Sequence, residues 1–359
     1  MVFPTLASEK AISIYSNYLL ENIRKKDINI EGMTYTAGSP GTFLKKLGDL
    51  YNYDVIHLQH EYNILGWYGT PFFLVLPLLK LFKKGSLVVT MHTAPSQKEK
   101  FKGNFLKNWM RKILYIFQNR LINWASDSVV VHEKFYRDVL VKEYGFSRDK
   151  IHHIPQGVPE NMPLIDKKKA KKDLNLSGPV YLMIGNLTHD NGSDIVLRQA
   201  GEIKKNILFV TNPNAVNTRN KKKMTDWINF NKSIVEKNNF QKFVRFDLKD
   251  IPNPLWWKYL SAADLLLQPY RGGIRSGVFS DAMASKTPVI ASNIKFFNEM
   301  SKNFGCLMVA NKEGEYPQLI KQAMKPKNYL KMQKECERYL KLNGVSHLAE
   351  DYKKLYLNQ

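Results

Sequence analysis

Residues 264–292 read DLLLQPYRGGIRSGVFSDAMASKTPVIAS, and this stretch predicts a strand, a glycine-rich turn, a helix and a second strand. Segment 264–267 is a short apolar run of the kind found in strands that are buried on both faces. Pro269 and Tyr270 end this strand. Segment 288–291 has the same apolar character, so the stretch predicts one βα unit of a parallel sheet.

The turn between these two strands has the composition of an anion site. It carries three glycines, which allow a backbone to approach a ligand closely. Ser276 is a good N-cap for a helix that starts near Gly277, and the unpaired N–H groups of a helix N-terminus attract anions. Arg275 adds a positive charge, and Asp281, about one turn further on, can accept hydrogen bonds from hydroxyls. The stretch therefore predicts an anion and a polyol bound at the end of a parallel sheet.

Length and composition predict a globular protein of two domains. The chain has 359 residues, of which 44% are hydrophobic and 24% charged. Cys306 and Cys336 cannot form a disulfide framework, which favours a reducing compartment. No signal peptide is recognised, and the longest apolar run, 71–82, is too short to span a bilayer. We expect a cytoplasmic protein, with peripheral binding to the inner face of the cell membrane as a further option.

The net charge of +22 indicates anionic partners. Nucleic acid, a membrane surface and phosphorylated substrates all fit such a charge, as does a merely solvated lysine-rich surface. The sequence has no zinc-type spacing, RNP motif or helix-turn-helix pattern, so nucleic acid is not the expected partner. A nucleic-acid-binding protein stays open as an alternative, on charge alone.

Polar residues follow two buried strands of the first half. Segment 54–58 leads into His60 and Glu61, and segment 86–91 leads into His92. Strand ends of this kind face the ligand crevice in open α/β sheets. These side chains are therefore candidates for catalysis, and the alternative is that the histidines are ordinary core residues.

Segment 97–124 predicts a basic amphipathic helix. Aromatic and aliphatic side chains recur on it at a spacing of four, namely Phe101, Phe105, Trp109, Ile113, Phe117 and Leu121. Such a helix is typical of a membrane-surface element, and we expect its part between Lys98 and Lys112 to contact an anionic membrane. The alternative is an ordinary core helix with a solvated lysine face; in either case much of the ladder is expected to pack inward.

The sequence resembles a known family over nearly its whole length, most strongly at 264–292, moderately at 54–66 and 86–95, and weakly at the N-terminus. The pattern D-L-L-L-x-P-Y…S-G-V-x-x-D-A-M-A-S-x-T-P-V-I-A-S at 264–292 resembles the donor-site signature of the retaining glycosyltransferases of family 4. The strings QHEYNILG at 59–66 and IPQGV at 154–158 resemble other parts of such enzymes. The resemblance implies the α/β fold called GT-B, with two Rossmann-like domains whose parallel sheets face each other across a cleft.

The same resemblance implies a domain layout. Residues 1–158 would form an acceptor-binding domain and 159–178 a linker. Residues 179–340 would form the nucleotide-sugar-binding domain, and the final helix, 341–359, would cross back onto the first domain.

The resemblance also assigns roles to residues. His92 would contact the donor sugar, with His60 and Glu61 nearby, and Arg275 would face the diphosphate. Family members carry two glutamates eight residues apart; here these positions are Gly273 and Asp281, the latter expected at the ribose.

The remaining donor-site positions follow from the same comparison. An arginine and a lysine that neutralise the diphosphate in the family correspond to Asn186 and Asn191. The other predicted donor contacts are Gly185, Phe246, Tyr270, Ser276 and Gly277. There is no Asp-x-Asp in a strand context, so no metal and no cofactor are expected, the nucleotide-diphospho-sugar being a co-substrate of UDP or GDP type.

We therefore expect a metal-independent retaining glycosyltransferase that moves a sugar to a glycan or a lipid-linked acceptor at the cytoplasmic membrane face. The alternative is a non-catalytic GT-B scaffold that partners another glycosyltransferase or the membrane. It is kept because three positions that are charged in the family, 186, 191 and 273, are neutral here, and each lost charge-assisted hydrogen bond costs ~1.5–3 kcal/mol.

Overall fold

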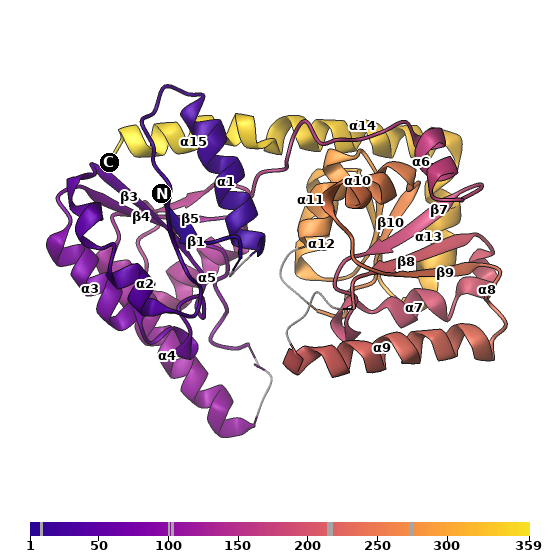
Figure 1. Ribbon diagram of the computed structural model, residues 1–359, viewed down its shortest axis with the longest axis horizontal. Coiled ribbons are helices and arrows are strands. Elements are labelled where there is room, and N and C mark those ends of the chain that lie inside the picture. Colours follow the sequence, from indigo (N-terminus) through magenta and orange to yellow (C-terminus); the bar gives the residue numbers. More distant parts are fainter. Residues whose placement is uncertain (8–9, 100, 102–103, 214–217, 273–275) are drawn as a thin grey trace. The chain divides into compact units, whose positions relative to one another are not determined.

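The computed structural model describes residues 1–7, 10–99, 101, 104–213, 218–272 and 276–359 (Figure 1). Gly273 and Arg275, two of the predicted site residues, lie outside the described residues. The chain divides into two compact units. The first consists of Met1–Gly157 together with Val345–Gln359, and the second is Val158–Gly344.

Over its described residues, the first unit contains a six-stranded sheet in the order β2-β1-β3-β4-β5-β6. Every neighbouring pair in it is parallel. The strands are β1 Val2–Pro4, β2 Met33–Tyr35, β3 Val55–His60, β4 Ser86–Met91, β5 Ser128–Val131 and β6 Ile151–His153. The helices are α1 Lys10–Arg24, α2 Pro40–Leu44, α3 Phe72–Phe82, α4 Phe105–Ala125, α5 Lys134–Tyr144 and α15 Val345–Leu357, with the short 3-10 turns η1 Gly48–Asn52 and η2 Trp67–Gly69.

Helices cover both faces of this sheet, which explains why its strands read as continuous apolar runs. Helices α1 and α15 lie side by side on one face and share an apolar cluster with Val88 and Val130 (Figure 1). Helix α3 packs on the other face, where Phe72 contacts the ring of His60, and α4 packs against α3.

Over its described residues, the second unit contains a six-stranded parallel sheet in the order β12-β11-β10-β7-β8-β9. The strands are β7 Val180–Ile184, β8 Asn206–Thr211, β9 Val244–Leu248, β10 Leu265–Gln268, β11 Val289–Ser292 and β12 Leu307–Ala310. The helices are α6 Lys167–Asp173, α7 Ser193–Leu197, α8 Ala200–Ile203, α9 Thr218–Lys237, α10 Asn253–Ala262, α11 Gly277–Ala284, α12 Lys295–Asn303, α13 Tyr316–Ala323 and α14 Pro326–Asn343, with the 3-10 turns η3 His189–Asn191 and η4 Glu313–Glu315.

Alternation along the strands divides the core of the second unit into two layers. Val180, Leu182 and Ile184 of β7 face the cluster that includes residues of α10, α11 and α14. Tyr181 and Met183 face the opposite cluster, which includes residues of α7, α8 and α13. Both faces are thus buried under helices, and the predicted α/β class with two parallel sheets is confirmed.

The boundaries between the units differ from those expected. Segment 159–178, predicted as a linker, belongs to the second unit and contains α6, which packs against α10. The second unit extends to Gly344, and α15 begins the return to the first unit at Val345. The prediction of an interdomain linker at 159–178 was wrong, because this Lys-rich segment buries Ala170 and Leu174 in the core of the second unit.

Each sheet has one point where the strand order reverses, and ligands bind outside the carboxyl ends of the strands at such points. In the second unit this point lies between β7 and β10, because the chain goes from β7 to β8 on one side and places β10 on the other. In the first unit it lies between β1 and β3. The candidate residues are found at both places.

Candidate functional site

The loop after β10 and the start of α11 are joined by three polar side chains. Gln268 Nε2 donates hydrogen bonds to Ser276 Oγ at 2.6 Å and to Tyr270 Oη at 3.2 Å. Tyr270 Oη and Ser276 Oγ are 3.0 Å apart. Ser276 Oγ also accepts from the backbone N–H of Phe279 at 3.2 Å, which caps α11 as the sequence predicts. The start of α11 is therefore fixed at the carboxyl edge of β10.

The turn after β7 is clamped to the same place. Asn191 Oδ1 accepts from Thr188 N at 3.0 Å and from Thr188 Oγ1 at 2.8 Å, and the Asn191 side chain also hydrogen-bonds Tyr270. Gly192 has φ +63°, and a Cβ there would lie 1.9 Å from the carbonyl oxygen of Pro269. Only glycine fits this close approach, which holds Asn191 against Tyr270.

Arg271 ties the two loops together further. Its guanidinium makes a bidentate ion pair with Asp194, at 2.7 and 2.8 Å, and donates to the carbonyl of His189 at 3.0 Å. The carboxylate of Asp194 is almost fully buried. Arg271 is thus a structural cation that is already neutralised, and we assign it no role toward an anionic ligand.

Asp281 lies on α11 against the indole ring of Trp256. Its Oδ2 accepts a hydrogen bond from Trp256 Nε1 of α10 at 3.1 Å. Gly185, which follows β7 with φ +119°, lies against the same side chains: a Cβ there would be 3.4 Å from Val278 and 3.8 Å from Trp256. Burial raises the pKa of Asp281 to about 7. The carboxyl group can therefore take up or release a proton near neutral pH.

The other predicted residues of the second unit are placed unevenly. Asn186 is exposed in the turn after β7, and Gly277 is the exposed first residue of α11. Phe246 was predicted to border a bound base, but its ring packs on Phe209 inside the apolar cluster of α7 and α8. That prediction is not supported, because Phe246 lies in the middle of β9 and not at its carboxyl end.

In the first unit a chain of hydrogen bonds leads across the sheet to His92. His57 Nδ1 lies 2.6 Å from Tyr356 Oη of α15, and His57 Nε2 lies 2.7 Å from Thr90 Oγ1. Gln59 Nε2 lies 3.2 Å from His57 Nε2, and Gln59 Oε1 lies 2.9 Å from His92 Nε2. His57 and Gln59 are both buried, whereas His92 is half-buried at the end of β4.

This network assigns tautomers to the two histidines. An amide nitrogen can only donate, so Gln59 Nε2 requires an unprotonated Nε2 on His57. Burial lowers the pKa of His57 well below its ordinary value, so the ring is neutral and carries its proton on Nδ1 toward Tyr356. Gln59 Oε1 then accepts from Nε2–H of His92.

Aromatic rings hold His92 on its other sides. Tyr15 of α1 meets it edge-on with ring centroids 5.6 Å apart, and the ring of His132 lies 5.1 Å away. Tyr15 Oη is in turn 3.0 Å from Tyr352 Oη of α15. The returning helix α15 therefore supports His92 through both Tyr352 and Tyr356.

Glu61 lies at the same edge of the sheet as His92, but His60 does not share their surroundings. Both carboxylate oxygens of Glu61 accept from Thr93 Oγ1 at 2.9 Å. His60 is fully buried on the α3 face, where its Nε2 lies 3.1 Å from Gln118 Nε2, and burial lowers its pKa to about 3. A catalytic role for His60 is not supported, because a buried neutral ring cannot reach a substrate.

Sequence reasoning missed Gln59, Trp256 and Gln268. Gln59 lies inside the predicted strand-end motif. The sequence of a strand that is covered on both faces does not show which of its side chains contacts the residue after the neighbouring strand, here His92. Trp256 is distant in sequence from its partner Asp281. Gln268 precedes a turn, and only the fold shows that this turn brings it to Ser276. Gln268 Oε1 is buried and has no hydrogen-bond partner among the described residues.

The comparisons with known proteins agree with this geometry. Residues 22–161 match Glycosyltransferase Family 4, so the predicted resemblance to that family is confirmed. A stretch of 85 residues is 32% identical to mannosylfructose-phosphate synthase from Agrobacterium fabrum and covers 22% of this chain but only 19% of that enzyme.

Solved structures show the same fold over the full length. Sucrose-phosphate synthase from Thermosynechococcus elongatus superposes with a TM-score of 0.76 at 16% identity, covering 99% of this chain and 98% of that one. HepE from Anabaena, solved in complex with UDP, superposes with a TM-score of 0.74 at 12% identity, covering 100% and 99%. The GT-B fold predicted from the sequence is confirmed.

No group of three or more histidine, cysteine, aspartate or glutamate side chains in the described ranges is arranged to hold a metal ion. No helix within the described part of the chain is both long and apolar enough to cross a membrane.

Proposed function

We propose that this protein is a retaining glycosyltransferase that uses a nucleotide-diphospho-sugar as donor. The observation that carries the proposal is the cluster at the switch point of the second sheet, where Gly185, Trp256 and Asp281 adjoin the capped N-terminus of α11. Asp281 would accept hydrogen bonds from the ribose hydroxyls, and Trp256 would border the nucleoside. No metal is required by this proposal.

The diphosphate is assigned to the start of α11. The first N–H groups of a helix have no partner inside the helix and favour a negative charge. A Cβ added to Gly277 would meet nothing within 4 Å, so a phosphate has room to approach the backbone there. Because Arg271 is already paired with Asp194, the positive charge is assigned to Arg275 of the same loop. Donors aimed at a leaving diphosphate stabilise charge that grows in the transition state.

The donor base is proposed to be uracil. HepE, which shares the fold, has been solved with UDP and with UDP-glucose. His92 is proposed to contact the transferred sugar from the first unit, with Glu61 as a second polar group at the same sheet edge. Gln59 holds the His92 ring through its Nε2, which orients the ring at this sheet edge.

The acceptor is proposed to be a lipid-linked glycan at the inner face of the cell membrane, to which the protein binds peripherally. The aromatic ladder of α4 supports this, because much of it is exposed instead of packing inward as expected. Phe105 is 84% exposed, and the exposed large apolar side chains of α4 are Phe105, Leu106, Trp109, Met110, Phe117 and Trp124. Exposed aromatics on a basic helix favour the surface of an anionic membrane.

The proposal is tested by thermal unfolding with UDP, GDP, ADP and dTDP, each with and without EDTA. A ligand that binds only the folded protein raises the free energy of unfolding by roughly 2.7 kcal/mol when its concentration is one hundred times its Kd. UDP should therefore raise the Tm of the protein more than the other three nucleotides do. The Tm increase should be the same with and without EDTA. Asp281→Ala should weaken UDP at least about tenfold. Ser285→Ala, at the other end of α11, is the matched control and should bind as the wild type does. No stabilisation by any of the four nucleotides would contradict the proposal.

One observation favours the second candidate, a non-catalytic scaffold. Asn186 and Asn191 carry no charge, and the side-chain oxygen of Asn191 is occupied by Thr188. A scaffold would bind none of the nucleotides and would instead raise the activity of a partner transferase. The same nucleotide panel distinguishes the two candidates.

A further inference from the structure

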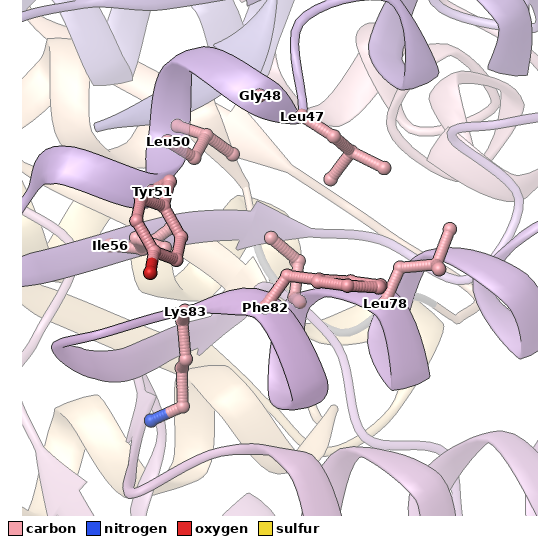
Figure 2. Close-up of a pocket in the computed structure, with 9 residues that line it drawn as sticks. Leu47, Gly48, Leu50, Tyr51, Ile56, Leu78, Phe82 and Lys83 are labelled. Carbon is pink, nitrogen blue, oxygen red and sulfur yellow. The ribbon is translucent and has the colours of Figure 1, made fainter.

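An apolar pocket opens on the first unit between η1 and the end of α3 (Figure 2). Its volume is about 430 Å³, within the roughly 300–1,000 Å³ of sites that bind small molecules. Figure 2 shows Leu50 and Tyr51 on one wall and Leu78 and Phe82 on the other. The complete lining is Leu47, Gly48, Leu50, Tyr51, Ile56, Leu78, Leu79, Phe82 and Lys83.

This pocket is separate from the candidate site. Ile56 is the second residue of β3, and Lys83 stands just before β4 begins at Ser86. The pocket is therefore at the amino edge of the sheet, whereas His92 follows the carboxyl end of β4. A ligand bound here cannot be the sugar on which His92 acts.

The lining selects an apolar ligand. Ile56, Leu79 and Leu50 form a buried floor, and Phe82, 62% exposed, forms the outer wall. The only polar side chains in the lining are the hydroxyl of Tyr51 and the ammonium of Lys83. A carboxylate or a sugar would lose hydration here without gaining partners.

Positive charge borders the wall of the pocket that α3 forms. Lys83 is part of the lining, and Lys80 of α3 shares the carboxylate of Asp127 with it. Lys84 lies over the ring of Tyr51, 4.4 Å from its centroid. Nearby carboxylates are Asp49 and Asp127, and Asp127 pairs with Lys83. Lys80, Lys83 and Lys84 together outnumber these two aspartates, and the positive rim that results favours an anionic head group.

Apolar side chains are exposed on the helix that forms the outer wall of the pocket. Leu81 and Leu74 of α3 are 71% and 53% exposed, so the helix that forms the outer wall presents apolar side chains to the surroundings. Asp127, which follows α4, pairs with both Lys80 and Lys83 and so joins the ends of α3 and α4. A lipid held in the pocket would therefore lie near the C-terminal end of α4, where Trp124 is 51% exposed.

We propose that this pocket binds one alkyl chain of an anionic lipid, with the phosphate of the head group on the lysines of the rim. This inference rests on the proposed membrane binding, because the membrane would supply the lipid. It does not depend on the nucleotide site, so the two can fail separately.

The test is calorimetric titration of the whole protein with octyl and decyl phosphate below their micelle-forming concentrations. Decyl phosphate should bind, and each added methylene should tighten binding by about fourfold, as expected for chain burial. Leu78→Trp fills the pocket and should weaken decyl phosphate at least tenfold. Leu74→Trp, on the same helix but outside the lining, is the matched control and should bind as the wild type does.

Three further measurements separate the possible failures. Lys84→Gln should weaken decyl phosphate but leave decanol unchanged, which assigns the head group to the rim. The Tm shift caused by UDP should be the same in all three variants, which shows that they are folded and that the nucleotide site is independent. Equal binding by Leu78→Trp and Leu74→Trp, or no binding of decyl phosphate at all, would overturn the inference.

Discussion

Gln59 is the residue on which the proposed role of His92 depends most directly. Its amide bridges His57 and His92, and because an amide has one donor end and one acceptor end it can fix the protonation pattern of both rings. His57 is held in turn by Tyr356 of α15. The tautomer of His92 is therefore determined by residues from β3 and from the end of the chain.

Gln59→Leu should lower turnover at least about fivefold with nucleotide affinity unchanged. The reason is that the half-buried His92 ring loses its hydrogen-bond partner, which costs about 1–3 kcal/mol, and the ring is then no longer held in its orientation. Steady-state kinetics and the nitrogen NMR shifts of the His92 ring would measure the effect. Gln118→Leu is the matched control, because Gln118 is equally buried and contacts His60 on the other face. If both variants lost turnover equally, the effect would be one of stability alone.

Asp281 should make the stability of the protein depend on pH. Burial raises its pKa from 3.8 to about 7 in the folded protein, so between pH 4 and 7 the folded state holds a proton that the unfolded state has lost. The free energy of unfolding therefore decreases as pH rises through this interval. Asp281→Asn lacks this titration. The difference in the free energy of unfolding between this variant and the wild type should therefore shift in favour of the variant by more than about 1 kcal/mol from pH 4.5 to pH 8.

Urea unfolding of the two proteins at several pH values would measure this difference. A constant difference between them from pH 4.5 to pH 8 would show that the carboxyl group titrates normally. Binding of uridine, which has no phosphate to titrate, should strengthen as pH rises through 7 in the wild type and stay constant in Asp281→Asn.

At the scale of elements, the sequence predicted the strands well and the orientation of their side chains poorly. Strand β3 was expected at 54–58 and is observed at Val55–His60, because an apolar run between polar turns is a strong signal. Its pleat sends Gln59 toward α15 and His60 toward α3, as their contacts show. A strand that is buried on both faces has no polar side to indicate which residue faces the site. His60 was therefore predicted as a candidate residue, although Gln59 is the one that contacts His92.

The helices show a related difference. The ladder of α4 was expected to pack largely inward, yet Phe105, Trp109 and Phe117 are more than half exposed. Amphipathic spacing predicts that one face is apolar but not what covers it. By contrast the N-cap at Ser276 and the helix that follows it were predicted correctly, because capping depends on neighbouring residues alone.

The exposed face of α4 should bind anionic vesicles. Leu106→Glu with Met110→Glu adds two negative charges to that face and removes apolar contact area, so co-sedimentation with vesicles containing anionic phospholipid should fall at least about tenfold. Leu330→Glu, an equally exposed leucine on α14 of the second unit, is the control and should sediment as the wild type does. Undiminished binding by the double variant would exclude α4 as the membrane contact.

At the scale of the whole molecule, the two units carry different parts of the proposed chemistry. The second unit holds the cluster for the nucleotide, and the first holds His92, the basic helix and the apolar pocket. The net charge of +22 suits both an anionic donor and an anionic surface, so membrane binding should weaken as salt screens it. Nucleotide affinity, fixed by short contacts in a partly buried site, should respond much less to salt.

The central claim, that the protein transfers sugar, is tested most directly by release of nucleoside diphosphate. Phosphorus NMR would follow the protein with UDP-glucose, UDP-galactose, UDP-N-acetylglucosamine or GDP-mannose, in the presence of anionic vesicles and a membrane lipid extract. We predict that one donor is consumed with release of its nucleoside diphosphate and that its sugar enters the lipid fraction, both being lost in His92→Ala. If none of the four donors were consumed under these conditions, the claim would be contradicted, and absence of nucleotide binding as well would leave the scaffold as the better account.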